Sequence, residues 1–229
     1  MNFTNTLVKG KLIKRYKRFF ADIEVNNKTV TAHCPNTGSM KGLLDQGNDA
    51  WISPQNDPSR KLKFTLEIIK VKKRLVGVNT HRANRIVQHG LENKLIEEFK
   101  NIKNIKPEFK FSSDTRFDFL CDKNLIEVKN VTLIREDDVA EFPDAVTERG
   151  AKHLKMLINS IKKGYKPYVL FLTQIQGINN FRIAKDIDPN YFKDYIKAKK
   201  AGVKFLAYRC TLNSKQIKIE KKIKIIDAK

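Results

Sequence analysis

The stretch RFDFLCDKNLIEVKNVTL, residues 116–133, decides the fold of the second half of the chain. Two runs with alternating apolar residues flank the tetrapeptide CDKN, whose composition is typical of a tight turn. In an extended strand, residues i and i+2 project to the same face. Glu127 and Lys129 therefore share a face, and a hairpin brings Asp118 onto the same patch.

Apolar residues surround this charged patch in the sequence. Phe117 and Phe119 flank Asp118, and Ile126 and Val128 alternate with the charged residues of the second strand. We expect these side chains to point away from the patch into a core. Two carboxylates and one ammonium group on a rigid sheet predict a Mg²⁺ site for phosphodiester chemistry. The alternative is a solvated face with a cross-strand ion pair; a helix predicted after the strand favours a cleft instead.

The charge balance is the strongest global signal. The 229 residues include 46 Lys and Arg against 25 Asp and Glu, a net charge of +21. Such an excess favours polyanions through phosphate contacts and counterion release, so nucleic acid is the leading partner. The alternatives are an anionic membrane surface, against which no basic amphipathic helix stands out, and a lysine-rich surface without a specific ligand.

The sequence favours the cytoplasm. The first twenty residues lack the apolar region of a signal peptide. No run approaches the roughly 18 apolar residues of a membrane span. The three cysteines, at 34, 121 and 210, are far apart and odd in number, which argues against a disulfide framework and against zinc.

Residues 1–82 are predicted to form short strands. Runs such as FFADIEV, KTVTAHC, DAWIS and LKFTLEII alternate apolar and polar residues between turns. Five or six strands in this length suit a small barrel, and an OB-fold is the natural candidate for a basic one.

From residue 83 the pattern changes to alternating helices and strands. Val87, Leu91, Leu95 and Phe99 recur at i+4 and predict one helix. A second helix is expected to start after Asp144 or Thr147, either of which can cap it. KPYVLFLTQI reads as a buried strand, and PNYFKDYIKAKKAG reads as a third helix.

Five blocks of the sequence resemble one known family. The chain is similar over nearly its whole length to the sugar fermentation stimulation protein A family of bacteria and archaea, on the blocks HCPNTGSM, VGVNTHRANRIV, RFDFL, IEVKNVTL and FPDAVTERGAKHL. The resemblance implies an α/β (α+β) fold, with an OB-fold barrel in residues 1–82 and a restriction-endonuclease-like, PD-(D/E)XK mixed-sheet domain in residues 83–229. It also implies DNA binding without sequence preference, and regulation of sugar (maltose) catabolism.

The resemblance assigns roles to the charged patch. Asp118 and Glu127 become the acidic ligands of Mg²⁺ or Mn²⁺, joined by the Val128 carbonyl, and Lys129 orients or helps deprotonate the attacking water. Phe117 stands where the superfamily motif has proline, which is not a ligand. Glu148 is a further candidate ligand. The dipeptide Pro143-Asp144 follows the E-x-K and is assigned to helix entry, with Asp144 as the cap.

Basic clusters and polar turns are the candidate DNA surface. In the loop HCPNTGS, Gly38 permits a positive φ, and the loop offers donors to phosphate. We expect contacts to the phosphate backbone and no base readout. The candidate nucleic-acid contacts are Lys14, Arg15, Lys17, Arg18, Asn36, Thr37, Arg82, Arg85, Arg149 and His153.

The sequence thus predicts a DNA-binding, metal-dependent deoxyribonuclease. Two alternatives stay open: a catalytically silent DNA-binding regulator on the same fold, and an RNA-binding OB-fold protein. A homodimer also stays open, and no residue pattern indicates a sugar site.

Overall fold

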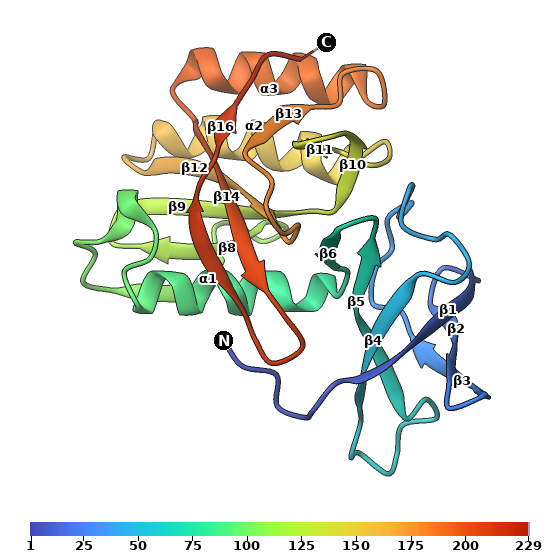
Figure 1. Ribbon diagram of the computed structural model, residues 1–229. Helices are drawn as coiled ribbons and strands as arrows, with labels where there is room; N and C mark the ends of the chain where they lie inside the picture. The colour runs from blue at the N-terminus through green and yellow to red at the C-terminus, as the bar shows by residue number, and fades with distance from the viewer. Residues whose placement is uncertain (229) are drawn as a thin grey trace.

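The computed structural model describes residues 1–228, which form a β-barrel followed by a mixed-sheet domain (Figure 1). The barrel strands lie in the order β3-β2-β1-β4-β5-β6, and β3 also pairs with β5, which closes the sheet on itself. The predicted OB-like barrel is confirmed. The strands are β1 (Val8–Tyr16), β2 (Phe20–Val25), β3 (Lys28–His33), β4 (Asp49–Pro54), β5 (Phe64–Val71) and β6 (Arg74–Gly77).

The barrel forms because its strands alternate apolar and polar residues, as strands half-buried in a closed sheet must. In β2, Ala21 and Ile23 are fully buried, whereas Asp22 between them lies nearer the surface. Leu12 of β1 and Ile52 of β4 pack in the same core.

The second domain is built on a six-stranded sheet in the order β15-β14-β12-β9-β8-β7. Its central strands β9, β12 and β14 are parallel, and the flanking pairs are antiparallel. A smaller sheet in the order β10-β11-β13-β16 lies beside it. The strands are β7 (Ile105–Lys110), β8 (Arg116–Cys121), β9 (Asn124–Val131), β10 (Leu133–Glu136), β11 (Val139–Phe142), β12 (Lys166–Thr173), β13 (Asn180–Ile183), β14 (Lys204–Leu212), β15 (Ile217–Lys222) and β16 (Lys224–Ile225).

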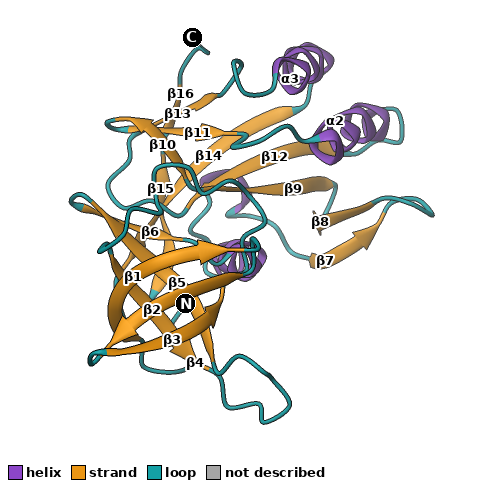
Figure 2. Cartoon of the chain, turned by 90° about the vertical axis from the view of Figure 1, so that its right-hand side faces the viewer, coloured by secondary structure: helices purple, strands orange, loops and turns teal. Residues whose placement is uncertain are grey.

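Helices cover both faces of the six-stranded sheet. Helix α1 (Ala83–Glu92) lies on one face, next to the barrel, whereas α2 (Glu148–Ile161) and α3 (Pro189–Ala201) lie on the other (Figure 2). Two apolar clusters correspond to these faces, one around α1 and one shared by the barrel, α2 and α3. A short 3-10 turn, η1 (Thr80–Arg82), leads from the barrel into α1, and a second, η2 (Glu97–Phe99), follows α1.

Helix α1 is shorter than the apolar spacing predicts. The predicted stripe extends to Phe99, but α1 ends at Glu92. Lys94 adopts φ 55°, and the Leu95 N–H donates back to the Gly90 carbonyl, a hydrogen-bond pattern that terminates helices. Leu95 is consequently 37% exposed and contributes no buried stripe position.

The cap of α2 is Thr147 and not Asp144. The Thr147 side chain accepts a hydrogen bond from the Gly150 N–H, 3.1 Å away. The observed cap therefore lies three residues after Asp144, the predicted cap. Asp144 instead accepts from the Ser39 N–H of the barrel, at 2.9 Å. Helix α3 follows the prediction, with Pro189 in its first turn and Gly202 at its end.

Two sequence inferences concern what the chain lacks. Within residues 1–228, no helix has the length and apolar character needed to cross a membrane. Cys34, Cys121 and Cys210 are all buried and free.

Candidate functional site

The candidate site lies where β8 and β9 separate. Their ladder ends with the pair Phe119–Ile126. One residue further, the Asp118 carboxylate accepts a hydrogen bond from the Val128 backbone N–H at 2.7 Å, so the side chain fills the fork between the strands.

The two phenylalanines that flank Asp118 pack on opposite sides of the sheet, contrary to the prediction. Phe117 and Phe119 were expected to point into one core, but Phe117 packs on the α2 side and Phe119 on the α1 side of the sheet. Ile126 and Val128 do share the core around α1, as predicted. The twist of β8 at Asp118 thus directs a carboxylate into the fork instead of leaving it on a flat sheet face.

The Asp118 carboxylate is held from two directions. Besides the Val128 N–H, it accepts from the side-chain amide of Asn84 on α1, at 2.6 Å. Burial, and then the negative charge of Glu127, raise the pKa of Asp118 to about 6 despite these hydrogen bonds. A nearby cation would stabilise the charged form of this carboxylate.

Glu127 is 4% exposed and has two basic partners. The Lys129 ammonium donates to Oε1 at 2.7 Å, and Nδ1 of His153 on α2 contacts the same oxygen. Burial by itself would raise the pKa of Glu127, but Lys129 and His153 hold it below its usual range. The structure therefore brings Asp118, Glu127 and Lys129 to one place, and adds His153 and Asn84.

Two of the predicted phosphate contacts lie on α2. His153 is buried and contacts Glu127, one of the two predicted acidic ligands. Arg149 is exposed. Glu148, the further candidate ligand, is exposed in the first turn of α2 and lines a hollow between α2 and α3.

Asn84 was missed by sequence reasoning. It stands in the block VGVNTHRANRIV, but 34 residues separate it from Asp118 and no spacing rule relates an amide on a helix to a distant strand. Only the packing of α1 on the sheet brings the two together.

The residues at the fork fit a divalent cation with oxygen ligands. Asp118 and Glu127 supply carboxylates whose mutual repulsion is recorded in the raised pKa of Asp118. Among the described residues no group of three or more His, Cys, Asp or Glu side chains forms a metal site. Mg²⁺ is commonly bound in proteins through one or two carboxylates, with waters as the other ligands.

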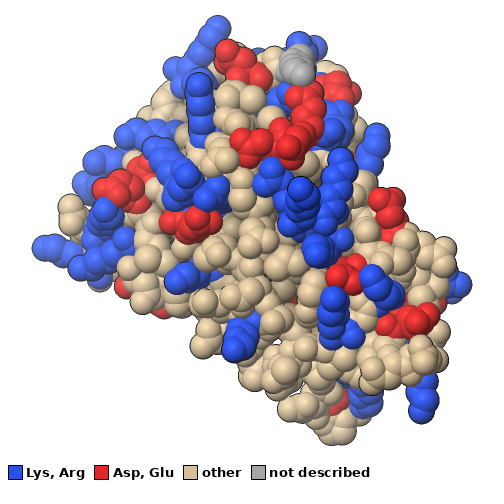
Figure 3. Space-filling model, viewed as in Figure 1, with Lys and Arg blue, Asp and Glu red and all other residues tan. Residues whose placement is uncertain are grey.

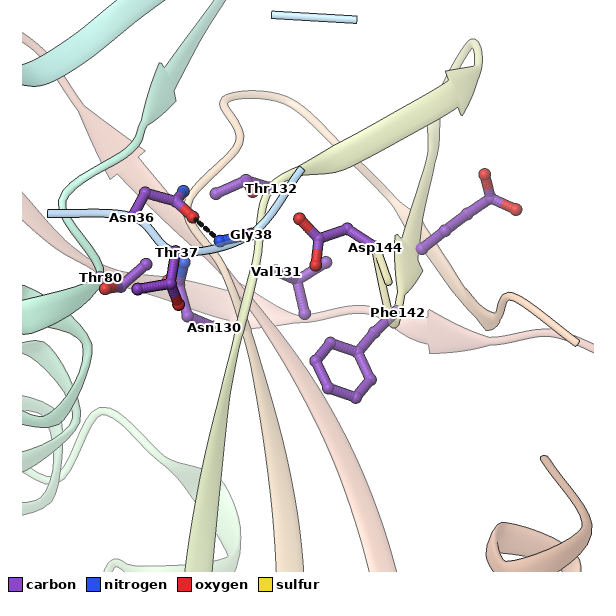
Figure 4. A pocket seen from close by; sticks show the side chains of 10 residues that line it. Asn36, Thr37, Gly38, Thr80, Asn130, Val131, Thr132, Phe142 and Asp144 are labelled. Carbon is purple, nitrogen blue, oxygen red and sulfur yellow. Dashed lines mark hydrogen bonds between the residues drawn. The ribbon is translucent and has the colours of Figure 1, made fainter. Parts of the chain in front are cut away.

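A cavity of about 210 Å³ separates the barrel from the end of β9 (Figure 4). Asn36, Thr37 and Gly38 line it from the barrel, and Asn130, Thr132 and Asp144 are among the lining residues of the second domain. The loop of the barrel therefore lies at the domain cleft.

The reason for glycine at position 38 differs from the prediction. Gly38 is absent from the positions with positive φ, and Met40, at φ 51°, adopts that conformation. A Cβ on Gly38 would lie 2.2 Å from Oδ2 of Asp144. Any side chain at position 38 would require the Asp144 carboxylate of the second domain to shift.

Two predicted DNA contacts hold this loop in place. The Arg15 guanidinium donates to the carbonyls of Asn36, Gly38 and Ser39. Arg18 donates to the remaining carbonyl, that of Thr37, at 2.8 Å. Four consecutive carbonyls are thus bound by two side chains, which gives Arg15 and the exposed Arg18 a structural role in this loop.

Arg82 is likewise engaged within the protein. Its guanidinium makes two hydrogen bonds, of 2.6 and 2.7 Å, to the buried carboxylate of Glu67 and stacks on Phe3. It lacks the freedom expected of a phosphate contact. Arg85, one turn further on, is exposed, as are Lys14 and Lys17.

Basic side chains are spread widely over the molecule. Figure 3 shows Lys and Arg over both domains on one face, with acidic side chains between them. This distribution accompanies the net charge of +21.

Family profiles and relatives cover nearly the whole chain. The family described as "Sugar fermentation stimulation protein RE domain" matches residues 81–216, and "SfsA N-terminal OB domain" matches residues 13–78. The sugar fermentation stimulation protein homolog of Pelagibacter ubique (strain HTCC1062) is 66% identical, with 100% of both chains covered. The homolog from Pseudoalteromonas atlantica is 40% identical over 99% of this chain and 100% of its own length.

A solved structure shares the fold. The structure of Pyrococcus furiosus SfsA in complex with Ca²⁺ aligns with a TM-score of 0.87 and 22% identity, covering 99% of this chain and 98% of that one. The match supports the arrangement of an OB-like barrel followed by a mixed-sheet domain.

Proposed function

Because the chain belongs to the sugar fermentation stimulation protein family, we propose that it binds DNA and hydrolyses phosphodiesters with a divalent cation held at the β8–β9 fork. The observation that carries the proposal is the convergence of Asp118, Glu127 and Lys129 there. Paired acidic ligands next to a lysine supply what phosphodiester hydrolysis requires: a cation site and a positive group near the reacting phosphorus.

The residues of the fork have distinct roles in this proposal. Asp118 and Glu127 hold Mg²⁺ or Mn²⁺, with the Val128 carbonyl completing the protein's share of ligands. When bound, the cation polarises a phosphoryl oxygen and lowers the pKa of a water. Lys129 leaves Glu127 to neutralise charge that develops at phosphorus, and orients the attacking water.

Two neighbours position the ligands. Asn84 fixes the orientation of the Asp118 carboxylate through its 2.6 Å hydrogen bond. His153 holds Glu127 from the α2 side. Partners of this kind set the orientation of metal ligands and commonly matter to affinity as much as the ligands themselves.

Two further observations support the proposal. The Pyrococcus furiosus structure is described as a complex with Ca²⁺, and Ca²⁺ and Mg²⁺ are both hard cations that take oxygen ligands. The charge of +21 supplies the attraction to DNA. A role in sugar catabolism, which the names of the relatives suggest, would then be exerted through DNA.

A second function is favoured by one specific observation. The Glu127 carboxylate contacts both Lys129 and His153, so its interactions are satisfied within the protein. A catalytically silent DNA-binding regulator would keep this network as a structural element.

Cleavage assays separate the two functions. End-labelled single- and double-stranded DNA are incubated with wild type and Lys129→Met, with Mg²⁺ or with EDTA. The nuclease proposal predicts cleavage by wild type that requires Mg²⁺ and is lost in Lys129→Met, while DNA affinity changes little. Undiminished binding with no cleavage in either protein supports the regulator. Repeating the binding assay with RNA tests the RNA-binding alternative.

A further inference from the structure

A second hollow, of about 260 Å³, lies where the barrel meets the start of α1. It is distinct from the β8–β9 fork: its walls come from β3, β5, the loop before β5 and the segment η1–α1. The lining residues that bear on its chemistry are His33, Gln55, Arg60, Thr65, His81 and Arg85.

The hollow has a positive charge that the protein does not balance. Its only carboxylate, Glu67, accepts from Ser53 and Asn79 and is paired with Arg82. The charges of two other arginines in the hollow, Arg60 and Arg85, are therefore not neutralised by Glu67. The Arg60 guanidinium donates to the Gln55 side chain at 2.6 Å. Neither arginine forms an ion pair with any residue in the described part of the chain.

The acidic residue on the loop that carries Arg60 does not change this balance. Asp57 lies on the loop before β5 and is fully exposed. Hydrogen bonds from Ser59 are the main cause of its lowered pKa, and the charge of Arg60 contributes less. The Asp57 carboxylate accepts hydrogen bonds from the N–H and the hydroxyl of Ser59 in the same loop.

Two histidines also line the hollow. The rings of His33 and His81 lie 6.4 Å apart between centroids. Burial, and then the charges of Arg60 and His81, lower the pKa of His33. Arg60 and His81 therefore lie close enough to His33 to affect its charge.

A polar group in the wall also lacks a partner. Thr65 is 5% exposed, and its hydroxyl oxygen makes no hydrogen bond with another described residue. Buried hydroxyl groups are normally satisfied, and an orphaned one needs an explanation. A bound acceptor would supply the missing partner.

We propose that this hollow is a binding site for a phosphoryl group, held by Arg60 and Arg85 and contacted by His33, His81 and Thr65. Guanidinium groups match the geometry of phosphate oxygens, and charge-assisted hydrogen bonds to them are strong. The site goes beyond the proposed cleavage because it requires neither a cation nor Asp118.

The phosphoryl group has two sources with the same chemistry. It belongs either to a phosphodiester of a strand lying on the barrel or to a free phosphate monoester such as a nucleotide.

The test is an NMR titration of the full chain with inorganic phosphate in EDTA. The four histidine rings are observed, with His89 and His153 as internal controls outside the hollow. We expect saturable shifts at His33 and His81, and a higher pKa for His33 with phosphate bound, because an anion offsets the charges of Arg60, Arg85 and His81. Arg82 and Glu67, which also border the hollow, remain paired with each other.

A matched pair of variants separates a site from bulk charge. Arg60→Gln combined with Arg85→Gln should weaken phosphate binding roughly tenfold or more, as expected for losing charge-assisted hydrogen bonds. Arg116→Gln combined with Lys123→Gln removes the same charge from exposed positions elsewhere and should leave the affinity within about twofold. No saturable shift in wild type, or equal loss in both double variants, would overturn the proposal.

Two probes identify the source. If a thymidine oligonucleotide without terminal phosphate shifts both histidines at lower concentration than thymidine monophosphate, the site holds a strand. The reverse order assigns it to a free monoester. Failure of DNA cleavage would leave this site standing, since no step of the test depends on hydrolysis.

Discussion

The Asp118 carboxylate accepts the backbone N–H of Val128, 2.7 Å away, where β8 leaves β9. Val128 stands between Glu127 and Lys129, so one hydrogen bond ties the first acidic residue to the E-x-K segment. The bond also satisfies a backbone donor that the interrupted ladder would leave open. Fold and candidate site thus share the same contact.

This double role predicts different effects for two substitutions. Asp118→Asn keeps an oxygen that can accept from Val128, so its free energy of unfolding should stay within about 1 kcal/mol of wild type. Asp118→Ala leaves the part-buried N–H without an acceptor and should cost about 1–3 kcal/mol. Urea denaturation measures both. Equal stability of the two variants would show that the hydrogen bond contributes nothing.

Close approach of the domains at Gly38 predicts a rescue. Gly38→Ala places a Cβ 2.2 Å from the Asp144 carboxylate and should destabilise the protein by about 1–3 kcal/mol. Asp144→Ala removes the obstructing oxygens, so the same glycine substitution should cost much less in that background. A double-mutant cycle by thermal unfolding tests this. Additive effects would contradict the proposed clash.

Because Arg82 is paired with the buried Glu67, we expect replacement of Arg82 to destabilise the protein much more than replacement of Arg85. Arg82→Met leaves the Glu67 carboxylate, 2% exposed, without its cation and should cost about 3–5 kcal/mol. Arg85→Met, at an exposed position, should stay within about 0.5 kcal/mol. Chemical denaturation of both variants is the measurement. A small loss for Arg82→Met would restore it as a candidate for phosphate binding.

The lowered pKa of His33 predicts a pH dependence of stability. The unfolded chain binds the proton more tightly, so the contribution of His33 is present above pH 6.5 and is lost as the pH falls below it. His89, whose pKa is also lowered, acts in the same direction. His33→Gln should therefore flatten the profile between pH 7 and 5 only in part, and phosphate should flatten that of wild type. An unchanged profile in His33→Gln would contradict the assignment.

Different roles of neighbouring basic residues predict different salt effects. Lys14→Gln and Lys17→Gln, at exposed positions, should each reduce the slope of log affinity against log salt by about 1. Arg15→Gln should disturb the Asn36–Ser39 loop, so DNA binding changes together with thermal stability. Fluorescence anisotropy over a range of NaCl concentrations measures the slopes. Slopes that stay at the wild-type value would exclude both lysines.

The part of the site that follows strand periodicity could be predicted. Glu127 and Lys129 share a face because alternation is a local property, and Asp118 joins them because the short turn fixes the hairpin register. The contacts of Asn84, Arg15 and Asp144 depend on how separate elements pack, which leaves no local pattern. The end of α1 was mispredicted because apolar spacing continued past residues whose backbone reverses the helix.

The most direct test of the central claim is a Mn²⁺ titration of wild type and Asp118→Asn, with free Mn²⁺ followed by electron paramagnetic resonance. Wild type is expected to bind one Mn²⁺ per chain. Asp118→Asn is expected to bind Mn²⁺ with an affinity at least roughly tenfold weaker, because it lacks an acidic ligand. Equal Mn²⁺ binding by the two folded proteins would contradict the assignment of the cation to the β8–β9 fork.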